Sequence, residues 1–163
     1  MRAVIMFDPE DLWPASQEAM MRFAAAEGAE AAGALAASNA LNERRWDELR
    51  MGCAPDFVCV DHRPLALLGT LDREQWDESL KAIVGLSDGV TYANYDVLAW
   101  NESGIVTAVA RHGTVPEGGG DFDDGFLAFY QVADGRLVRL DLFAEHDTEG
   151  ALACFDAHSV AQG

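Results

Sequence analysis

The segment NERRWDELRMGCAPDFVCVDHR, residues 42–63, changes from a helical to an extended pattern near its middle. Trp46, Leu49 and Cys53 recur at the spacing of one helix face, so the first part predicts a helix. Pro55 disfavours helical geometry in the residue before it and is expected to end this helix. The following DFVCV contains a phenylalanine and two valines and predicts a short strand. A helix therefore leads almost directly into a strand.

The strand ends at three consecutive ionisable side chains, Asp61, His62 and Arg63, before the chain becomes apolar again. Because successive side chains on a strand point to opposite faces, only one of Asp61 and His62 can face the interior. Two explanations for this polar end stay open. It is either a solvated turn or the rim of a pocket that contains reactive groups.

Further helices are expected on both sides of this segment. Upstream, the chain from Pro14 onward is rich in Ala, Glu, Met and Leu, which are good helix formers, and Gly28 and Gly33 divide it into two or three helical segments. Downstream, Asp72 is followed three residues later by a glutamine, an arrangement close to a capping box. Gly85 is placed to end the helix that Asp72 opens.

The second half of the chain predicts strands, because runs rich in apolar, β-prone residues are separated by clear turn signals. The expected strands cover residues 90–100, 105–115, 126–133 and 137–144, and a short helix over 148–157 closes the chain. The acidic, glycine-rich run between the second and third strands reads as a mobile hairpin tip. Helices followed by hairpin-linked strands indicate an α+β domain, with helices on one side of a curved antiparallel sheet.

The composition limits the function. The chain has 163 residues, 28 acidic against 11 basic, and a formal net charge of −17. Such a charge repels phosphate backbones and anionic lipid, so neither nucleic acid nor a membrane surface is an expected partner. No stretch approaches the roughly 20 apolar residues of a membrane span, and the N-terminus lacks a secretory pattern. We expect a soluble cytoplasmic protein.

The cysteines and histidines do not suggest a metal site. Cys53, Cys59 and Cys154 are odd in number and form no C-x-x-C pair, which favours buried, inert thiols in a reducing compartment. The four histidines show no spacing typical of metal ligands. We therefore expect neither a metal ion nor another cofactor.

Four segments, in their order and spacing, resemble the SnoaL-like branch of the nuclear transport factor 2-like (NTF2-like) superfamily. They are residues 42–63, LDREQWDESL at 71–80, VTAVARHGTV at 106–115 and DGRLVRLDLFAEHDTEGALACFDAH at 134–158. The resemblance covers about residues 35–158. It implies an α+β fold in which a cone-shaped curved antiparallel sheet wraps around N-terminal helices and encloses an apolar ligand cavity. Residues 1–34 would form an N-terminal strand and a helical extension, and residues 35–163 the SnoaL-like domain.

The resemblance also suggests catalytic residues. The superfamily includes ketosteroid isomerase, scytalone dehydratase and polyketide cyclases, and Asp61 stands where ketosteroid isomerase carries its general-base aspartate. A carboxylate among apolar groups has a raised pKa and can exchange protons. His112 lies in the region where scytalone dehydratase and SnoaL-type cyclases place an active-site histidine. It would be the acid partner of Asp61, or the donor that stabilises an enolate.

Simpler interpretations stay open for both residues. Asp61 and Arg63 can form a strand-end salt bridge. His112 shares its strand face with small residues, which leave room for either a ligand or a closely packed helix, and a lone strand histidine is usually structural.

Five further side chains are candidates for substrate binding: Trp46, His62, Tyr95, Arg111 and Tyr130. As a buried arginine, Arg111 is expected to pair with an acid such as Asp141 or Glu145. The Arg-x-Asp spacing of limonene epoxide hydrolase is absent, because the second residue after Arg111 is a glycine, and this argues against epoxide opening.

Two functions follow from these observations. The first is a cofactor-free isomerase, dehydratase or cyclase that acts by general acid/base proton transfer on an apolar carbonyl substrate. The second is a non-catalytic ligand-binding or dimerisation domain of a larger, regulatory protein. In either case we expect a small apolar ligand as partner, and a homodimer formed through the outer face of the sheet.

Overall fold

The computed structural model describes residues 22, 26, 29–66 and 68–160. Its helices are α2 (Ala29–Asn42), α3 (Trp46–Gly52), α4 (Arg73–Gly85) and α5 (Thr148–Val160). Its strands are β1 (Cys53–Asp61), β2 (Thr70–Asp72), β3 (Asp88–Asn101), β4 (Gly104–Val115), β5 (Gly120–Ala133) and β6 (Arg136–Ala144). The predicted N-terminal strand lies outside the described residues. None of the described helices is long and apolar enough to cross a membrane.

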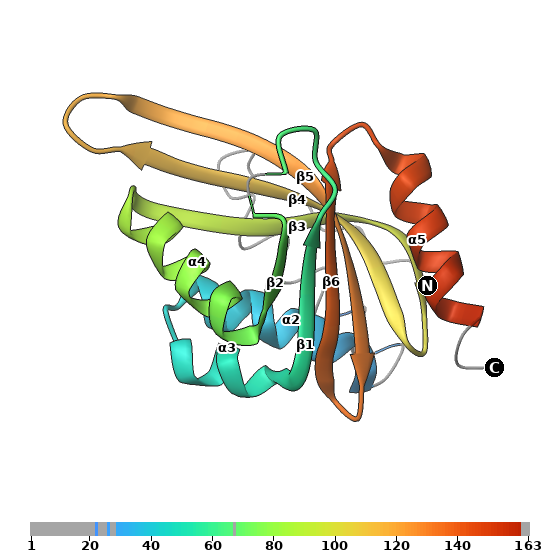
Figure 1. The fold of residues 1–163 in the computed structure, drawn as a ribbon. Helices are drawn as coiled ribbons and strands as arrows, with labels where there is room; N and C mark the ends of the chain where they lie inside the picture. Colours follow the sequence, from blue (N-terminus) through green and yellow to red (C-terminus); the bar gives the residue numbers. More distant parts are fainter. Residues whose placement is uncertain (1–21, 23–25, 27–28, 67, 161–163) are drawn as a thin grey trace.

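The strands form one curved, unclosed sheet in the order β2-β1-β6-β5-β4-β3 (Figure 1). The neighbouring pairs are antiparallel except β1 and β6, which run parallel. The prediction of an α+β fold with a curved sheet is confirmed. The short strand β2 and the parallel pair were not predicted, because both depend on partners that are distant in the sequence.

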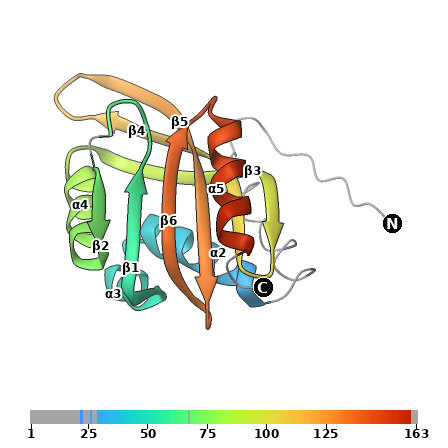
Figure 2. The same ribbon diagram turned by 45° about the vertical axis from the view of Figure 1, so that its right-hand side comes forward.

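The helices cover both faces of the sheet, so the prediction of helices on one side only is wrong. Helices α2, α3 and α4 lie on one face, which we call the inner face, and α5 lies on the opposite, outer face (Figures 1 and 2). Each face has its own apolar cluster. The inner cluster includes Phe57, Val109 and Phe126, and the outer cluster includes Val106 and Phe129. Fully burying one large apolar side chain contributes about 1.5–3 kcal/mol, so both clusters hold the helices firmly to the sheet.

Helix α4 begins and ends where the sequence predicts. The Asp72 carboxylate accepts a hydrogen bond from the Gln75 backbone N–H at 2.9 Å, and the Gln75 side chain accepts one from the Asp72 backbone N–H at 3.0 Å. This reciprocal pair is the predicted capping box, which is worth about 1 kcal/mol. Gly85 is the last helical residue. The cap fixes the start of the helix that carries Trp76 and Leu80 toward the sheet.

Three local predictions were wrong. Gly33 lies inside α2 and does not divide the helical region there. Cys53 begins strand β1 instead of continuing the preceding helix, so the strand is longer than DFVCV. The expected hairpin tip is shorter than predicted, because β5 already begins at Gly120 and pairs along its length with β4. Asp123 lies opposite His112 and Asp124 opposite Arg111. Opposite-charge pairs across a ladder stabilise it, which explains why this acidic run is a strand.

Candidate functional site

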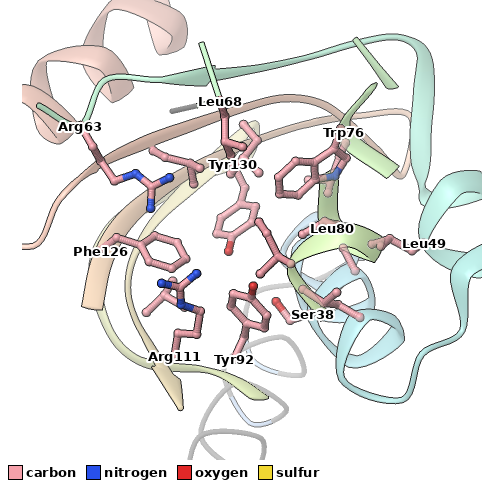
Figure 3. A pocket seen from close by; sticks show the side chains of 17 residues that line it. Ser38, Leu49, Arg63, Leu68, Trp76, Leu80, Tyr92, Arg111, Phe126 and Tyr130 are labelled. Carbon is pink, nitrogen blue, oxygen red and sulfur yellow. The ribbon is translucent and has the colours of Figure 1, made fainter. Parts of the chain in front are cut away.

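An apolar pocket lies between the inner face of the sheet and helices α2, α3 and α4 (Figure 3). It offers about 70 Å³ of space for the centres of water-sized molecules. One water needs roughly 10–15 Å³ by this measure, so the pocket is large enough for a small ligand. Most of its wall is apolar, and α4 contributes Trp76, Leu80 and Ile83 from one helix face.

Few polar side chains interrupt this wall. Apart from the indole of Trp76, they are Ser38, Arg63, Tyr92, Arg111 and Tyr130. Among the described residues, no carboxylate and no histidine lines the pocket. The pocket therefore combines apolar walls with two cationic groups and three hydroxyl groups.

Arg63 reaches the pocket from the end of β1, held by its neighbour Asp61. The Asp61 carboxylate accepts hydrogen bonds from Arg63 Nε at 2.8 Å and from Arg63 Nη2 at 2.9 Å. It also accepts the backbone N–H groups of Arg63 at 3.1 Å and of Leu68 at 3.4 Å. Only 1% of the Asp61 side chain is exposed, against 28% for Arg63. The buried carboxylate thus fixes the orientation of the Arg63 guanidinium, which faces the pocket.

This environment does not fit the predicted role of Asp61 as a general base. Burial disfavours the ionised carboxylate, but the hydrogen bonds from Arg63 outweigh it and lower the pKa of Asp61. A general base near neutral pH needs a raised pKa and access to substrate. The Asp61 side chain is not part of the pocket lining. The strand-end ion pair, the alternative interpretation from the sequence, describes the observed geometry.

Arg111 enters the pocket from β4 and pairs with Asp124 of β5. Arg111 Nε lies 2.8 Å from Asp124 Oδ1, and Nη2 bonds the second carboxylate oxygen. The prediction that Arg111 pairs with Asp141 or Glu145 is wrong, because the ladder places Asp124 directly opposite Arg111. Arg111 also hydrogen-bonds the hydroxyl of Tyr92. Burial raises the pKa of Tyr92, although the Arg111 charge opposes this, so the phenol stays protonated.

Tyr130 belongs to a buried polar network at the back of the pocket. Its hydroxyl lies next to the side chains of Ser38 and Thr107. Asn94 joins these two groups, because its amide donates to Ser38 Oγ at 3.0 Å and its carbonyl accepts from Thr107 Oγ1 at 2.7 Å. Burial raises the pKa of Tyr130 to about 12. The network therefore presents a neutral phenol in a fixed orientation.

His112, the second predicted catalytic residue, lies outside the pocket. Arg111 and Val109 of β4 line the pocket, so His112 points to the opposite face of the strand. Its Nδ1 atom lies 2.6 Å from an exposed Asp123 carboxylate. On the same face, Val106 packs in the outer cluster together with α5. The small residues that share the His112 face thus accommodate a closely packed helix, which was one of the two alternatives.

The remaining predicted substrate-binding residues separate into two groups. Tyr130 and Arg111 line the pocket, whereas His62, Tyr95 and Trp46 do not. His62 bonds Asp141 and stacks on Phe143 with ring centroids 4.6 Å apart.

The other two lie away from the pocket. Tyr95 is 46% exposed, and burial and the Glu145 charge raise its pKa. Trp46 lies beneath the Lys81 ammonium, 5.6 Å from the ring centroid.

Arg63 and Ser38 line the pocket but were not predicted from the sequence as binding residues. The spacing could have indicated Arg63. It stands two residues after Asp61, which was predicted to face the pocket, and residues two apart on a strand share a face. No comparable signal marks Ser38, a small polar residue within an alanine-rich helix, since only the packing of α2 on the sheet brings it to Tyr130.

The thiols are poor candidates for nucleophiles. Burial raises the pKa of Cys53 to about 11, of Cys59 to about 12 and of Cys154 to about 11, and none forms a disulfide. Since the thiolate is the reactive form, these cysteines are unreactive near neutral pH. Within the described part of the chain, no group of three or more His, Cys, Asp or Glu side chains is arranged to hold a metal ion.

Comparison with solved structures identifies the fold. IdmH from Streptomyces antibioticus, named as a candidate polyketide cyclase, is 23% identical with a TM-score of 0.61, over 69% of this chain and 89% of that chain. TerC, co-crystallised with polyporic acid, is 18% identical with a TM-score of 0.59, over 71% and 90%. A ketosteroid isomerase-like protein from Catenulispora acidiphila, in complex with trimethylamine, is 14% identical with a TM-score of 0.58, over 70% and 85%.

No protein-family model and no curated protein sequence matches the chain. The structural likenesses confirm the predicted fold, which this chain shares with ketosteroid isomerase-like members of the NTF2-like superfamily. At these identities they show the fold alone.

Proposed function

We propose that this protein binds a small, largely apolar molecule in the pocket between the sheet and helices α2–α4. The observation that carries the proposal is the pocket itself, in which apolar walls surround a few convergent polar groups. This combination is typical of small-molecule sites, where the apolar surface supplies affinity and the polar groups orient the ligand. Two neighbours of the same fold, TerC and the Catenulispora protein, have small molecules in their crystals.

The hydroxyl groups of Tyr92 and Tyr130 both point into the pocket (Figure 3). Both phenols have raised pKa values and therefore keep their protons near neutral pH. They can hydrogen-bond a carbonyl or hydroxyl oxygen of the ligand. The ligand class that fits is a cyclic or aromatic molecule with at least one oxygen substituent.

A cofactor-free isomerase, dehydratase or cyclase is the second candidate. Arg63, Arg111 and Tyr92 could stabilise an oxyanion that develops on a carbonyl substrate, as preorganised donors do in many enzymes. Proton transfer also needs an acceptor, and the described residues that line the pocket include no carboxylate or histidine. The geometry therefore favours binding without turnover over acid/base catalysis.

Filling the pocket tests the proposed function. Ala37 lines the pocket on α2, so Ala37→Phe would occupy the space that the ligand needs. Aromatic amides and the corresponding carboxylates, with one or two rings, serve as probes, and binding is followed by ligand-observed NMR and by the melting temperature. A ligand of the native state raises the melting temperature, so we expect binding to the wild type and loss of at least tenfold in affinity in Ala37→Phe.

The matched control is Ala82→Phe on the exposed side of α4, which should bind the probes as the wild type does. Failure of every probe to bind the wild type, or unchanged binding in Ala37→Phe, would contradict the proposal.

The homodimer stays a prediction. Helix α5 covers part of the outer face, but Tyr95 of β3 remains 46% exposed. We propose that a homodimer formed through this face has Tyr95 in its contact. The strand neighbour Asn94 points inward, so Tyr95 points toward the outer face. Sedimentation analysis of the wild type and of Tyr95→Glu checks this. If Tyr95 lies in the contact, the wild type should sediment as a dimer and Tyr95→Glu as a monomer.

A further inference from the structure

The two arginines of the pocket lie in an unusual setting. Arg63 and Arg111 come from strands that are not neighbours in the sheet, yet both guanidinium groups lie on the same side of the pocket, near the Phe126 ring (Figure 3). Arg63 Cζ lies 5.6 Å from the centre of that ring. The hydrogen bonds to Asp61 raise the pKa of Arg63, and the Arg111 charge acts in the opposite direction because the two cations repel each other.

Each arginine is oriented by a carboxylate behind it. Asp61 bonds Nε and Nη2 of Arg63, and Asp124 bonds the same two nitrogens of Arg111. An arginine has five N–H donors in a planar fork, so both ion pairs leave the Nη1 donors for other partners. On Arg111, one hydrogen bond also reaches the Tyr92 hydroxyl. Two fixed guanidinium groups thus keep donors that their carboxylates do not use.

The surroundings strengthen any charged contact made here. The pocket wall is mostly apolar, and electrostatic interactions are stronger where water is displaced by apolar groups. An oxyanion between the two guanidiniums would relieve their mutual repulsion and accept charge-assisted hydrogen bonds from both. Guanidinium groups match the planar geometry of a carboxylate particularly well.

We infer that the ligand of this pocket is an organic anion, an apolar ring system that carries a carboxylate held between Arg63 and Arg111. The inference rests on the proposed function, because it names the class of ligand for the same pocket. Tyr92, bonded to Arg111, completes the polar end of the site, and α4 with Trp76 and Leu80 covers the ring system.

The overall charge of the protein makes this inference easy to test. A formal net charge of −17 repels anions from the protein as a whole. A preference for an anion over its neutral analogue must therefore come from local groups. Matched pairs of aromatic carboxylates and carboxamides, such as 2-naphthoate and 2-naphthamide with their one-ring counterparts, have nearly the same shape and differ in charge.

Isothermal titration calorimetry of these pairs at neutral pH is the experiment. We expect the carboxylates to bind at least tenfold more tightly than the carboxamides, and this ratio to fall as salt is added. In Arg111→Met the ratio should fall to about one, while the carboxamides keep their affinity. Asp124, the partner of Arg111, is 46% exposed, so the variant leaves no buried charge unpaired. Arg136→Met removes an exposed arginine outside the pocket and should keep the wild-type ratio.

The outcomes separate the two proposals. Carboxamides that bind as tightly as carboxylates would overturn the anion inference and leave the proposed function standing. An unchanged ratio in Arg111→Met would overturn it as well. If neither member of any pair binds the wild type, the proposed function itself fails. Arg63→Gln combined with Asp61→Asn gives a second variant without an unpaired buried charge, in which the ratio should fall in the same way.

Discussion

The two faces of the sheet carry two similar ion pairs with different surroundings. On the inner face Asp61 binds Arg63, and on the outer face Asp141 binds Arg139 at 2.5 Å and 2.9 Å. In both pairs the aspartate is buried and the arginine is two residues away on or next to the same strand. Strands β1 and β6, which carry them, are neighbours in the sheet.

The difference lies in what the arginine faces. Arg63 turns into the pocket, whereas Arg139 lies beside Cys154 of α5 and bonds its side chain. His62 links the two faces, because it stands between Asp61 and Arg63 in the sequence and bonds Asp141 Oδ1 at 2.6 Å. The comparison shows that an Asp–Arg pair is part of a binding site or of the core according to the element packed against it.

The largest expected effect is on stability, at the outer pair. Asp141 is fully buried and bonds both Arg139 and His62, so Asp141→Asn leaves Arg139 without its buried counter-charge. Breaking a buried ion pair costs about 3 kcal/mol or more. Urea unfolding should show this loss, with ligand affinity unchanged. The matched control is Asp56→Asn at an exposed position of β1, and a loss at Asp141 as small as at Asp56 would remove the distinction between core and surface pairs.

The inner pair should be less costly to break and should respond to pH. Asp61→Asn leaves Arg63 half-buried without its partner, which we expect to cost about 2 kcal/mol at neutral pH. The pKa of Asp61 is lowered on folding from its usual value of 3.8. Its carboxylate therefore stabilises the fold above that pH, and this stabilisation is lost as the pH falls through the lower, folded-state pKa.

The stability difference between the wild type and Asp61→Asn should accordingly be constant from about pH 7 to pH 5 and shrink below pH 3.8. Urea unfolding at several pH values measures it. A difference that does not depend on pH would mean that the ion pair contributes nothing and that only the shape of the side chain matters.

Ligand affinity should distinguish the arginines of the two ion pairs, Arg63 and Arg139. Arg63→Lys keeps the positive charge but loses the planar fork, so we expect aromatic carboxylates to bind about tenfold more weakly, a change of about 1.4 kcal/mol. Arg139→Lys makes the same chemical change on the outer face and should leave the affinity unaltered. Equal effects of the two substitutions on binding would show that the pocket is not the binding site.

The smallest effect is expected for the residue that links the pairs. His62→Gln can keep a hydrogen bond to Asp141, and because the His62 side chain is 39% exposed the loss of stability should be below about 1 kcal/mol. As the surface control, His112→Gln breaks an exposed pair with Asp123 and should have no measurable effect. If His62→Gln proved as harmful as Asp141→Asn, the histidine and not the arginine would be the main partner of Asp141.

Much of the fold could be predicted because its signals are local. The capping box at Asp72, the end of α4 at Gly85 and five of the six described strands follow from short sequence patterns. The site could not be predicted to the same degree. On β4 both faces are apolar, with Val109 on the inner and Val106 on the outer side, so alternation alone does not reveal which face meets the ligand.

The same limit explains the predicted catalytic pair. Asp61 and His112 lie on strands whose side-chain directions the sequence leaves open. The resemblance to known enzymes suggested which positions could be catalytic, but not which side chains would bond to these residues. The pairing of β4 with β5 places Asp123 opposite His112, whereas Arg63, the partner of Asp61, is only two residues away in the sequence. Asp61 pairs with Arg63, and His112 pairs with Asp123 outside the pocket.

By itself, the sequence determined the order of helices and strands, their caps and the acidic character of the protein, since these depend on residues within a few positions of one another. Only the tertiary structure decided that Arg63 and Arg111 meet in one apolar pocket, because that depends on how strands distant in sequence are ordered in the sheet and on which face the helices cover. Local propensity fixes what each segment is, whereas long-range packing fixes what each side chain touches.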